Sequence, residues 1–139
     1  MGILAKNLLF YDKYLSIFVK KKYMPFPITS MSAQLPVADL ERAIRFYTGT
    51  LGFELSFRYE DFYAGVVKNG FSLHLKEGKP HGNKVNGDID LIFTVADVEG
   101  VYRVLAGQAI VEPLREMPYG KEFYLEDPDG YVLAFLQVE

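Results

Sequence analysis

A short motif that occurs twice constrains the fold of this chain more than any other feature. The first copy is Val37–Glu41 (VADLE), and the second is Val95–Glu99 (VADVE). Both follow an apolar run, so each Asp stands where an extended segment gives way to a helix. An Asp side chain there can accept a hydrogen bond from an amide of the first helical turn. The chain is therefore predicted to contain two copies of one structural unit.

The residues behind each motif support this repeat. Apolar residues recur at the i, i+3, i+4, i+7 spacing of a helix with one buried face. They are Leu40, Ala43, Ile44 and Tyr47 in the first copy, and Val98, Val101, Tyr102 and Leu105 in the second. A second echo relates Gly70–Leu75 to Gly130–Phe135 in its order of glycine, aromatic and aliphatic residues. We therefore predict an α+β fold of two βαβββ modules, residues 28–80 and 87–139.

Alternation, turn residues and helix signals give the expected elements. The expected helices are Leu40–Thr48 and Val98–Leu105. The expected strands are Ser32–Val37, Glu54–Tyr59, Phe62–Lys68 and Phe71–Lys76 in module one, and Ile89–Val95, Ala109–Glu112, Glu122–Glu126 and Tyr131–Val138 in module two. Residues Glu77–Asp88 are expected to link the modules, and Pro113–Gly120 to form a loop.

Composition excludes some classes of protein. Half of the 139 residues are hydrophobic and 15% are aromatic, which suits a packed core and argues against global disorder. A formal net charge of −3 argues against a nucleic-acid partner, whose binding surface is normally basic. The chain has no cysteine, so disulfides and thiol catalysis are excluded and a cytoplasmic location is expected.

Residues 1–27 form an N-terminal extension outside the repeat. Their apolar positions could line an amphipathic helix, but Lys6, Asp12 and Lys13 interrupt them, so no membrane span is expected. The extension also lacks the pattern of a signal peptide. We expect it to dock on the domain or on a second subunit. The alternative is an anchor on a membrane surface.

These motifs resemble those of the vicinal oxygen chelate superfamily, which includes glyoxalase I, bleomycin-resistance proteins and extradiol dioxygenases. The resemblance covers about residues 30–138. It rests on Leu35–Glu41, Phe46-Tyr47, Leu51–Phe53 and Asp127–Gly130. It implies that each module curls a mixed sheet into half of a cup-shaped cavity, and that the protein is a homodimer. The resemblance also implies that, in metal-dependent relatives, the metal ligands come from the first and last strands of each module.

The resemblance places those ligand positions at Ser32, His74, Asp90 and Ala134. The internal repeat independently pairs Ser32 with Asp90, and His74 with Ala134. Ala134 cannot bind a metal and Ser32 is a poor ligand. Only His74 and Asp90 remain, fewer than the three protein ligands of ordinary catalytic zinc sites. A reduced His/carboxylate site stays open, as does a metal-free acid–base pair of the same two residues.

The competing interpretation is a metal-free binding cup. Strand alternation places Gln34 and Ile92 on the same faces as the four positions above. The aromatic residues Phe57, Phe62, Tyr63, Tyr119 and Tyr124 could stack on a planar ligand, although ordinary core packing is the more common role for each of them. The candidate ligand-binding residues are Ser32, Gln34, Phe57, Tyr63, His74, Asp90, Ile92, Tyr119, Tyr124 and Ala134.

The sequence thus favours a dimeric protein that binds a small aromatic or amphipathic molecule without a metal or other cofactor, as in antibiotic or toxin sequestration. The alternative is a divalent-metal lyase, isomerase or dioxygenase that uses His74 and Asp90. A third hypothesis, a partner-binding module, rests on the N-terminal extension alone.

Overall fold

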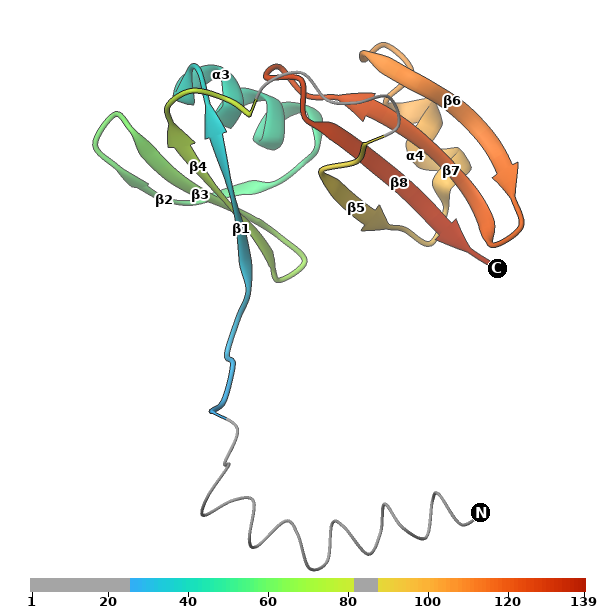
Figure 1. The fold of residues 1–139 in the computed structure, drawn as a ribbon, viewed down its shortest axis with the longest axis horizontal. Coiled ribbons are helices and arrows are strands. Elements are labelled where there is room, and N and C mark those ends of the chain that lie inside the picture. The colour runs from blue at the N-terminus through green and yellow to red at the C-terminus, as the bar shows by residue number, and fades with distance from the viewer. Residues whose placement is uncertain (1–25, 82–87) are drawn as a thin grey trace, which may run out of the picture. The chain divides into compact units, whose positions relative to one another are not determined.

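The computed structural model describes residues 26–81 and 88–139 (Figure 1). The chain divides into two units, residues 1–31 and 32–139. The helices and strands of the described residues all belong to the second unit. Most of the expected N-terminal extension and the middle of the expected linker lie outside the described residues. Among the residues that are described, no helix is both long and apolar enough to cross a bilayer.

The first module is one four-stranded sheet covered by a short helix (Figure 1). Its elements are β1 (Ser32–Val37), α3 (Leu40–Arg45), a π-helical turn η2 (Phe46–Thr50), β2 (Glu54–Tyr59), β3 (Tyr63–Lys68) and β4 (Phe71–Glu77). The strand order is β1-β4-β3-β2, and β1 pairs with β4 in parallel. The tight turn at Asn69-Gly70 takes positive φ at both residues, as a two-residue hairpin requires.

The second module repeats this topology. Its elements are β5 (Leu91–Thr94), α4 (Val98–Val104), β6 (Ile110–Met117), β7 (Gly120–Glu126) and β8 (Val132–Val138). The strand order is β5-β8-β7-β6, again with the first and last strands parallel. The predicted α+β fold of two βαβββ modules is confirmed.

The two motif aspartates cap their helices in the same way. Asp39 Oδ1 accepts a hydrogen bond from the Arg42 amide at 3.1 Å, and Asp97 Oδ1 accepts one from the Gly100 amide at 3.1 Å. Each bond satisfies an amide that would otherwise lack a partner in the first helical turn. The helix starts inferred from the repeat are therefore confirmed.

The hydrophobic core lies between each sheet and its helix. In module one, Leu35 and Val37 of β1 and Leu73 and Leu75 of β4 are buried, while the residues between them are not. In module two the buried face carries stacked rings, with Phe123 and Phe135 at 5.0 Å between centroids and 11° between planes. Within the described residues, no helix covers the opposite face of either sheet.

The structure corrects the expected boundaries of module two. Strand β6 runs to Met117, through a stretch that was expected to form a loop from Pro113. Pro113 is tolerated because β6 is an edge strand and its pairing with β7 shifts register between Glu112 and Arg115. Strand β5 is also shorter than expected, since its pairing covers only Leu91–Thr94.

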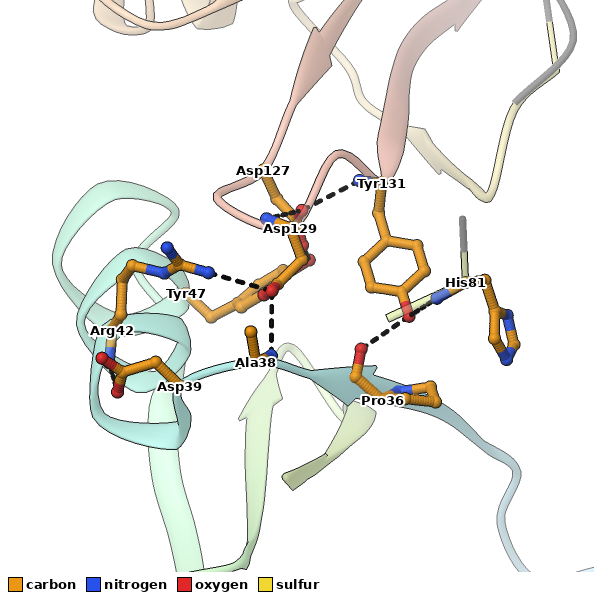
Figure 2. A network of polar contacts seen from close by, with 9 residues as sticks. All are labelled: Pro36, Ala38, Asp39, Arg42, Tyr47, His81, Asp127, Asp129 and Tyr131. Carbon is orange, nitrogen blue, oxygen red and sulfur yellow. Dashed lines mark hydrogen bonds and ion pairs between the residues drawn. The ribbon is translucent and has the colours of Figure 1, made fainter. Parts of the chain in front are cut away.

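A polar joint connects the β7–β8 turn of module two to module one (Figure 2). Asp129 Oδ1 accepts hydrogen bonds from the Ala38 amide at 2.9 Å and from Arg42 Nη2 at 3.0 Å. The Tyr131 hydroxyl donates to the Pro36 carbonyl at 2.6 Å. Both residues thus hold main-chain atoms at the end of β1.

The same joint has a buried centre. The Tyr47 hydroxyl of module one donates to Asp127 Oδ2 at 2.6 Å, while Asp127 Oδ1 accepts from the amides of Asp129 and Tyr131 (Figure 2). Burial raises the pKa of Asp127, although these hydrogen bonds oppose the rise. Asp127 therefore forms the turn and also ties it to a residue 80 positions away.

Candidate functional site

The face of each sheet that lies opposite its helix is here called its open face. The strand register of module one places Gln34, His74, Gly65 and Phe57 in one row across the open face of the first sheet. Ser32 lies on the same face of β1, where its hydroxyl contacts that of Ser72. Three strands therefore deliver polar and aromatic groups to one surface.

Four side chains on this face form a connected group, the His74 cluster: Gln34, Phe57, Tyr63 and His74. The Tyr63 hydroxyl lies 2.9 Å from Gln34 Nε2 and 2.9 Å from His74 Nδ1. The rings of Phe57 and Tyr63 stack with 6.1 Å between centroids and 16° between planes. The Phe57 ring also meets the His74 ring edge to face at 5.2 Å. The cluster thus combines a flat aromatic surface with a histidine at its edge.

Two backbone features place Phe57 in this cluster. A β-bulge between Leu55 and Phe57 puts these two residues on opposite faces of β2, although strand alternation alone would put them on the same face. Across the sheet, a Cβ added at Gly65 would lie 2.2 Å from the Phe57 ring. The bulge therefore sends Phe57 to the open face, and the missing side chain at Gly65 lets the ring lie against the sheet.

The open face of the second sheet carries a different group. Ile92 pairs with Ala134, and Ala134 pairs with Tyr124. Ile92 is 62% exposed, whereas Ala134 is buried. Tyr124 belongs to the Glu122 cluster, which consists of Arg115, Tyr119, Glu122 and Tyr124.

Every other member of the Glu122 cluster bonds to the carboxylate of Glu122, which is 4% exposed. Oε2 accepts from Arg115 Nη2 at 2.7 Å and from the Tyr124 hydroxyl at 2.6 Å, and Oε1 accepts from the Tyr119 hydroxyl. The Arg115 guanidinium also lies over the Tyr124 ring, 5.4 Å from its centroid. The cluster is a neutralised ion pair that fixes two tyrosine hydroxyls.

Electrostatics in the Glu122 cluster favours the charged form of the carboxylate. Burial alone would raise the pKa of Glu122, but hydrogen bonds from Tyr119, Tyr124 and Arg115 outweigh it, and the pKa lies below its ordinary value. The hydrogen bond to the same carboxylate raises the pKa of the Tyr119 phenol. Burial, with the Glu122 hydrogen bond, raises the pKa of Tyr124. Glu122 is therefore an acceptor and not a proton donor at neutral pH.

The sequence pattern points to Tyr119 and Tyr124 but not to Arg115 and Glu122. It places Arg115 in a loop and therefore gives no reason to put Arg115 opposite Glu122. Had β6 been extended through Pro113, the facing register of Arg115 and Glu122 would have given the signal, because opposite charges on paired positions are a common cross-strand contact.

Asp90 occupies a structural position in module two. Its Oδ2 accepts a hydrogen bond from the Val132 amide at 2.8 Å, and its own amide donates to the Val132 carbonyl at 2.9 Å. The carboxylate thus extends the pairing of β5 with β8 by one position. His74, the other member of the acid–base pair that the sequence leaves open, has its Nδ1 atom 2.9 Å from the Tyr63 hydroxyl.

The residues at the four positions implied by resemblance do not fit a metal centre. Ala134 offers no donor atom, the Ser32 hydroxyl contacts Ser72, and Asp90 is engaged with the backbone of β8. Within residues 26–81 and 88–139, no three His, Cys, Asp or Glu side chains lie where they could hold a metal ion together. The donor set therefore supports no step that runs through a metal.

Known proteins match this chain over most of its length, in agreement with the fold. A family model described as "Glyoxalase/Bleomycin resistance protein/Dioxygenase superfamily" matches residues 29–135. A protein named bleomycin resistance protein, from Geobacillus stearothermophilus, is 28% identical over 122 residues, which cover 74% of this chain and 92% of the relative.

Solved structures share the architecture. A glyoxalase/bleomycin resistance protein/dioxygenase from Alicyclobacillus acidocaldarius superposes with a TM-score of 0.69 at 22% identity, covering 83% of this chain and 95% of that one. A bleomycin-binding protein from Streptomyces verticillus, in complex with copper(II)-bleomycin, gives 0.65 at 22% identity, covering 83% of this chain and all of that one (100%). At these identities the two structures establish the fold.

Proposed function

Because the chain belongs to the glyoxalase/bleomycin resistance protein/dioxygenase superfamily, we propose that it is a binding protein that holds a small aromatic or amphipathic molecule without a metal. The His74 cluster carries this proposal. It offers a stacked pair of rings, one of which, Phe57, is 41% exposed on a sheet face that neither α3 nor α4 of the described residues covers. Mostly apolar surfaces with a few convergent polar groups are typical of small-molecule sites.

The proposed ligand class is an antibiotic or toxin, which the protein would sequester. The relative from Geobacillus stearothermophilus carries the name bleomycin resistance protein, and the Streptomyces verticillus protein was crystallised with copper(II)-bleomycin. Sequestration needs affinity and no nucleophile, which suits a face that combines aromatic rings with hydrogen-bonded polar groups. A cytoplasmic location would place such a protein where an antibiotic meets its target.

We also propose that the protein works as a homodimer. Every residue of β2 is exposed, and apolar side chains at both open faces, including Phe57 and Ile92, contact solvent in the single chain. A second copy could cover this surface, as apolar patches on monomers are usually small. Light scattering after gel filtration should give twice the mass of one chain. Removal of residues 1–25, which precede the family match at residue 29, should leave that mass ratio unchanged.

Calorimetric titration tests the binding function. Bleomycin, copper(II)-bleomycin and a panel of planar aromatic antibiotics should include at least one ligand with micromolar or tighter affinity. Phe57→Ala should lower the affinity for that ligand about tenfold or more. Stacked aromatic contacts contribute about 0.5–1.5 kcal/mol in addition to the free energy of burying apolar area, and the substitution removes both. Phe71→Ala is the matched control, because Phe71 is an exposed aromatic residue of the same sheet outside the His74 cluster.

Metal content separates this proposal from the metal-enzyme alternative. The purified protein should retain no zinc, nickel, manganese or iron(II) after incubation and dialysis. One tightly held metal per chain that is lost in His74→Ala would contradict the proposed metal-free function. That result would direct attention to dicarbonyl and catechol-type substrates.

A further inference from the structure

The hydrogen bonds of the His74 cluster have a direction. Gln34 directs its side-chain amide nitrogen at the Tyr63 oxygen, at 2.9 Å, and a nitrogen with hydrogens can only donate. The Tyr63 oxygen therefore accepts this bond and keeps its own hydrogen for another partner. That partner is His74 Nδ1, also at 2.9 Å. The chain of donors runs from Gln34 through Tyr63 to His74.

This direction selects one form of the imidazole. A nitrogen that accepts a hydrogen bond carries no hydrogen, so the single hydrogen of the neutral ring lies on Nε2. In the reverse arrangement, Tyr63 would accept two bonds and its hydroxyl hydrogen would have no protein partner within the described ranges. The arrangement with hydrogen on Nε2 satisfies both the Tyr63 hydroxyl and His74 Nδ1.

The surroundings leave Nε2 available to a ligand. The ring of His74 is only partly buried, and it meets the rings of Phe57 and Tyr63 edge to face at 5.2 and 5.5 Å. The part of the chain that the structure describes supplies no acceptor for Nε2, since the only hydrogen bond of this side chain is the one from Tyr63. A donor thus stands at the edge of an aromatic surface.

We propose that the Gln34–Tyr63–His74 chain fixes His74 as a neutral hydrogen-bond donor through Nε2, so that the site takes a planar aromatic ligand with a carbonyl-type acceptor beside its rings. This inference rests on the proposed binding function and narrows its ligand class. His74 contacts the ligand, whereas Tyr63 and Gln34 are positioning residues that act through it.

Nitrogen NMR tests the protonation pattern without any ligand. Long-range proton–nitrogen spectra of the full chain, recorded at about pH 8 where an ordinary imidazole is neutral, should show His74 with hydrogen on Nε2 alone. His81, the other of the 2 histidines, is exposed and serves as the internal reference. Tyr63→Phe should shift the His74 Nδ1 resonance and leave those of His81 in place. A His74 signal with hydrogen on Nδ1 would overturn the proposal.

A matched pair of probes tests the ligand class. Fluorenone-2-carboxylate and fluorene-2-carboxylate have the same planar skeleton and charge, and differ by one carbonyl oxygen. The wild type should bind the ketone about three- to tenfold more tightly, which is the size of one hydrogen bond. Tyr63→Phe and His74→Ala should abolish this preference. Tyr63→Phe should lower affinity for the ketone more than affinity for the hydrocarbon, because it removes the hydroxyl that positions His74 and keeps the ring that stacks on Phe57.

The outcomes separate this inference from the function on which it rests. Equal binding of the two probes would overturn the donor role of His74 while leaving a binding function in place. Binding of neither probe, with a member of the antibiotic panel still bound, would overturn the ligand class and preserve the function. Failure of the probes and the panel together would overturn both.

Discussion

Gly65 is the residue on which the arrangement of the His74 cluster depends. Gly65→Ala would place a Cβ 2.2 Å from the Phe57 ring, so the ring must move away from its present position. We expect a loss of about 1–3 kcal/mol in the free energy of unfolding, which is typical of overpacking. Urea denaturation measures it. Ligand affinity should fall with it, because the stacked surface is broken.

A double-mutant cycle provides the control for Gly65. In a Phe57→Ala background the clash has no partner, so the added cost of Gly65→Ala should shrink to a few tenths of a kcal/mol, as expected when coupling between neighbours is removed. An undiminished cost in that background would show that Gly65 is needed for another reason.

Because of Glu122, the free energy of unfolding should depend on pH in the acid range. Its folded pKa lies below the ordinary value of 4.5, so its stabilising contribution is fully present above that value and is lost as the pH falls through the folded pKa. At about pH 6, Glu122→Gln should cost about 1–3 kcal/mol, since bonds to a buried charged acceptor are replaced by neutral ones. The two proteins should approach each other in stability as the pH falls through the folded pKa of Glu122. Denaturant titrations at a series of decreasing pH values check this convergence.

The difference between wild type and Glu122→Gln must shrink as acid is added. A constant difference across this range would mean that the carboxylate is not ionised in the folded protein. The exposed Glu126 of the same strand offers a matched control, and Glu126→Gln should show little effect at any of these pH values.

Single residues were only partly predictable from sequence. Alternation along β1 and β4 placed Ser32, Gln34 and His74 on one face, because strand periodicity depends only on backbone geometry. The hydroxyl that joins Gln34 to His74 comes from Tyr63 on a third strand. The bond between Tyr63 and His74 depends on register, and alternation within one strand carries no information on that.

At the scale of elements, the two caps should contribute equally. Asp39→Ala and Asp97→Ala each remove one bond of 3.1 Å to an amide of the first helical turn. Each should lower the free energy of unfolding by about 1 kcal/mol. Urea denaturation checks both, with Asp61→Ala, a fully exposed carboxylate in the β2–β3 turn, as the control. A cost at only one of the two sites would contradict the structural equivalence of the modules.

The helices and most strands were predictable because the repeat supplied each element twice. Strand β6 was not, since Pro113 and the Pro118-Tyr119-Gly120 sequence both indicate breaks. An edge strand with a register shift tolerates a proline that a central strand would reject. The bulge in β2 was not predictable either. Leu55 and Phe57 are two residues apart, which predicts the same face of a strand, but they lie on opposite faces of the sheet.

At the scale of the whole molecule, the joint between the modules should control stability. Tyr47→Phe would leave Asp127 Oδ2 buried without the 2.6 Å bond that it now accepts. An unsatisfied buried group costs about 1–3 kcal/mol, so the free energy of unfolding in urea should fall by that amount. Tyr59→Phe is the matched control, because Tyr59 is 60% exposed. If the two substitutions cost the same, the bond to Asp127 contributes nothing to stability.

Sequence predicted that two modules exist but not how they are joined. Asp127 accepts hydrogen bonds from amides of its own turn, a local role that is common for Asp in turns. The contacts that Asp127 and Asp129 make with Tyr47, Ala38 and Arg42 link residues that are 80 to 91 positions apart, and no local pattern encodes such a distance.

The joint between the modules also affects which substitutions the protein can accept during evolution. Asp129 accepts a hydrogen bond from the Ala38 amide, and Tyr131 donates one to the Pro36 carbonyl. Every residue has a main-chain carbonyl, and every residue except proline has an amide hydrogen, so these contacts do not depend on the side chains of β1. Mutations at Ser32 or Gln34, which point to the open face of the same strand, leave both contacts untouched. If the proposed binding function holds, selection can change the ligand preference of β1 while the contacts that hold the modules together stay the same.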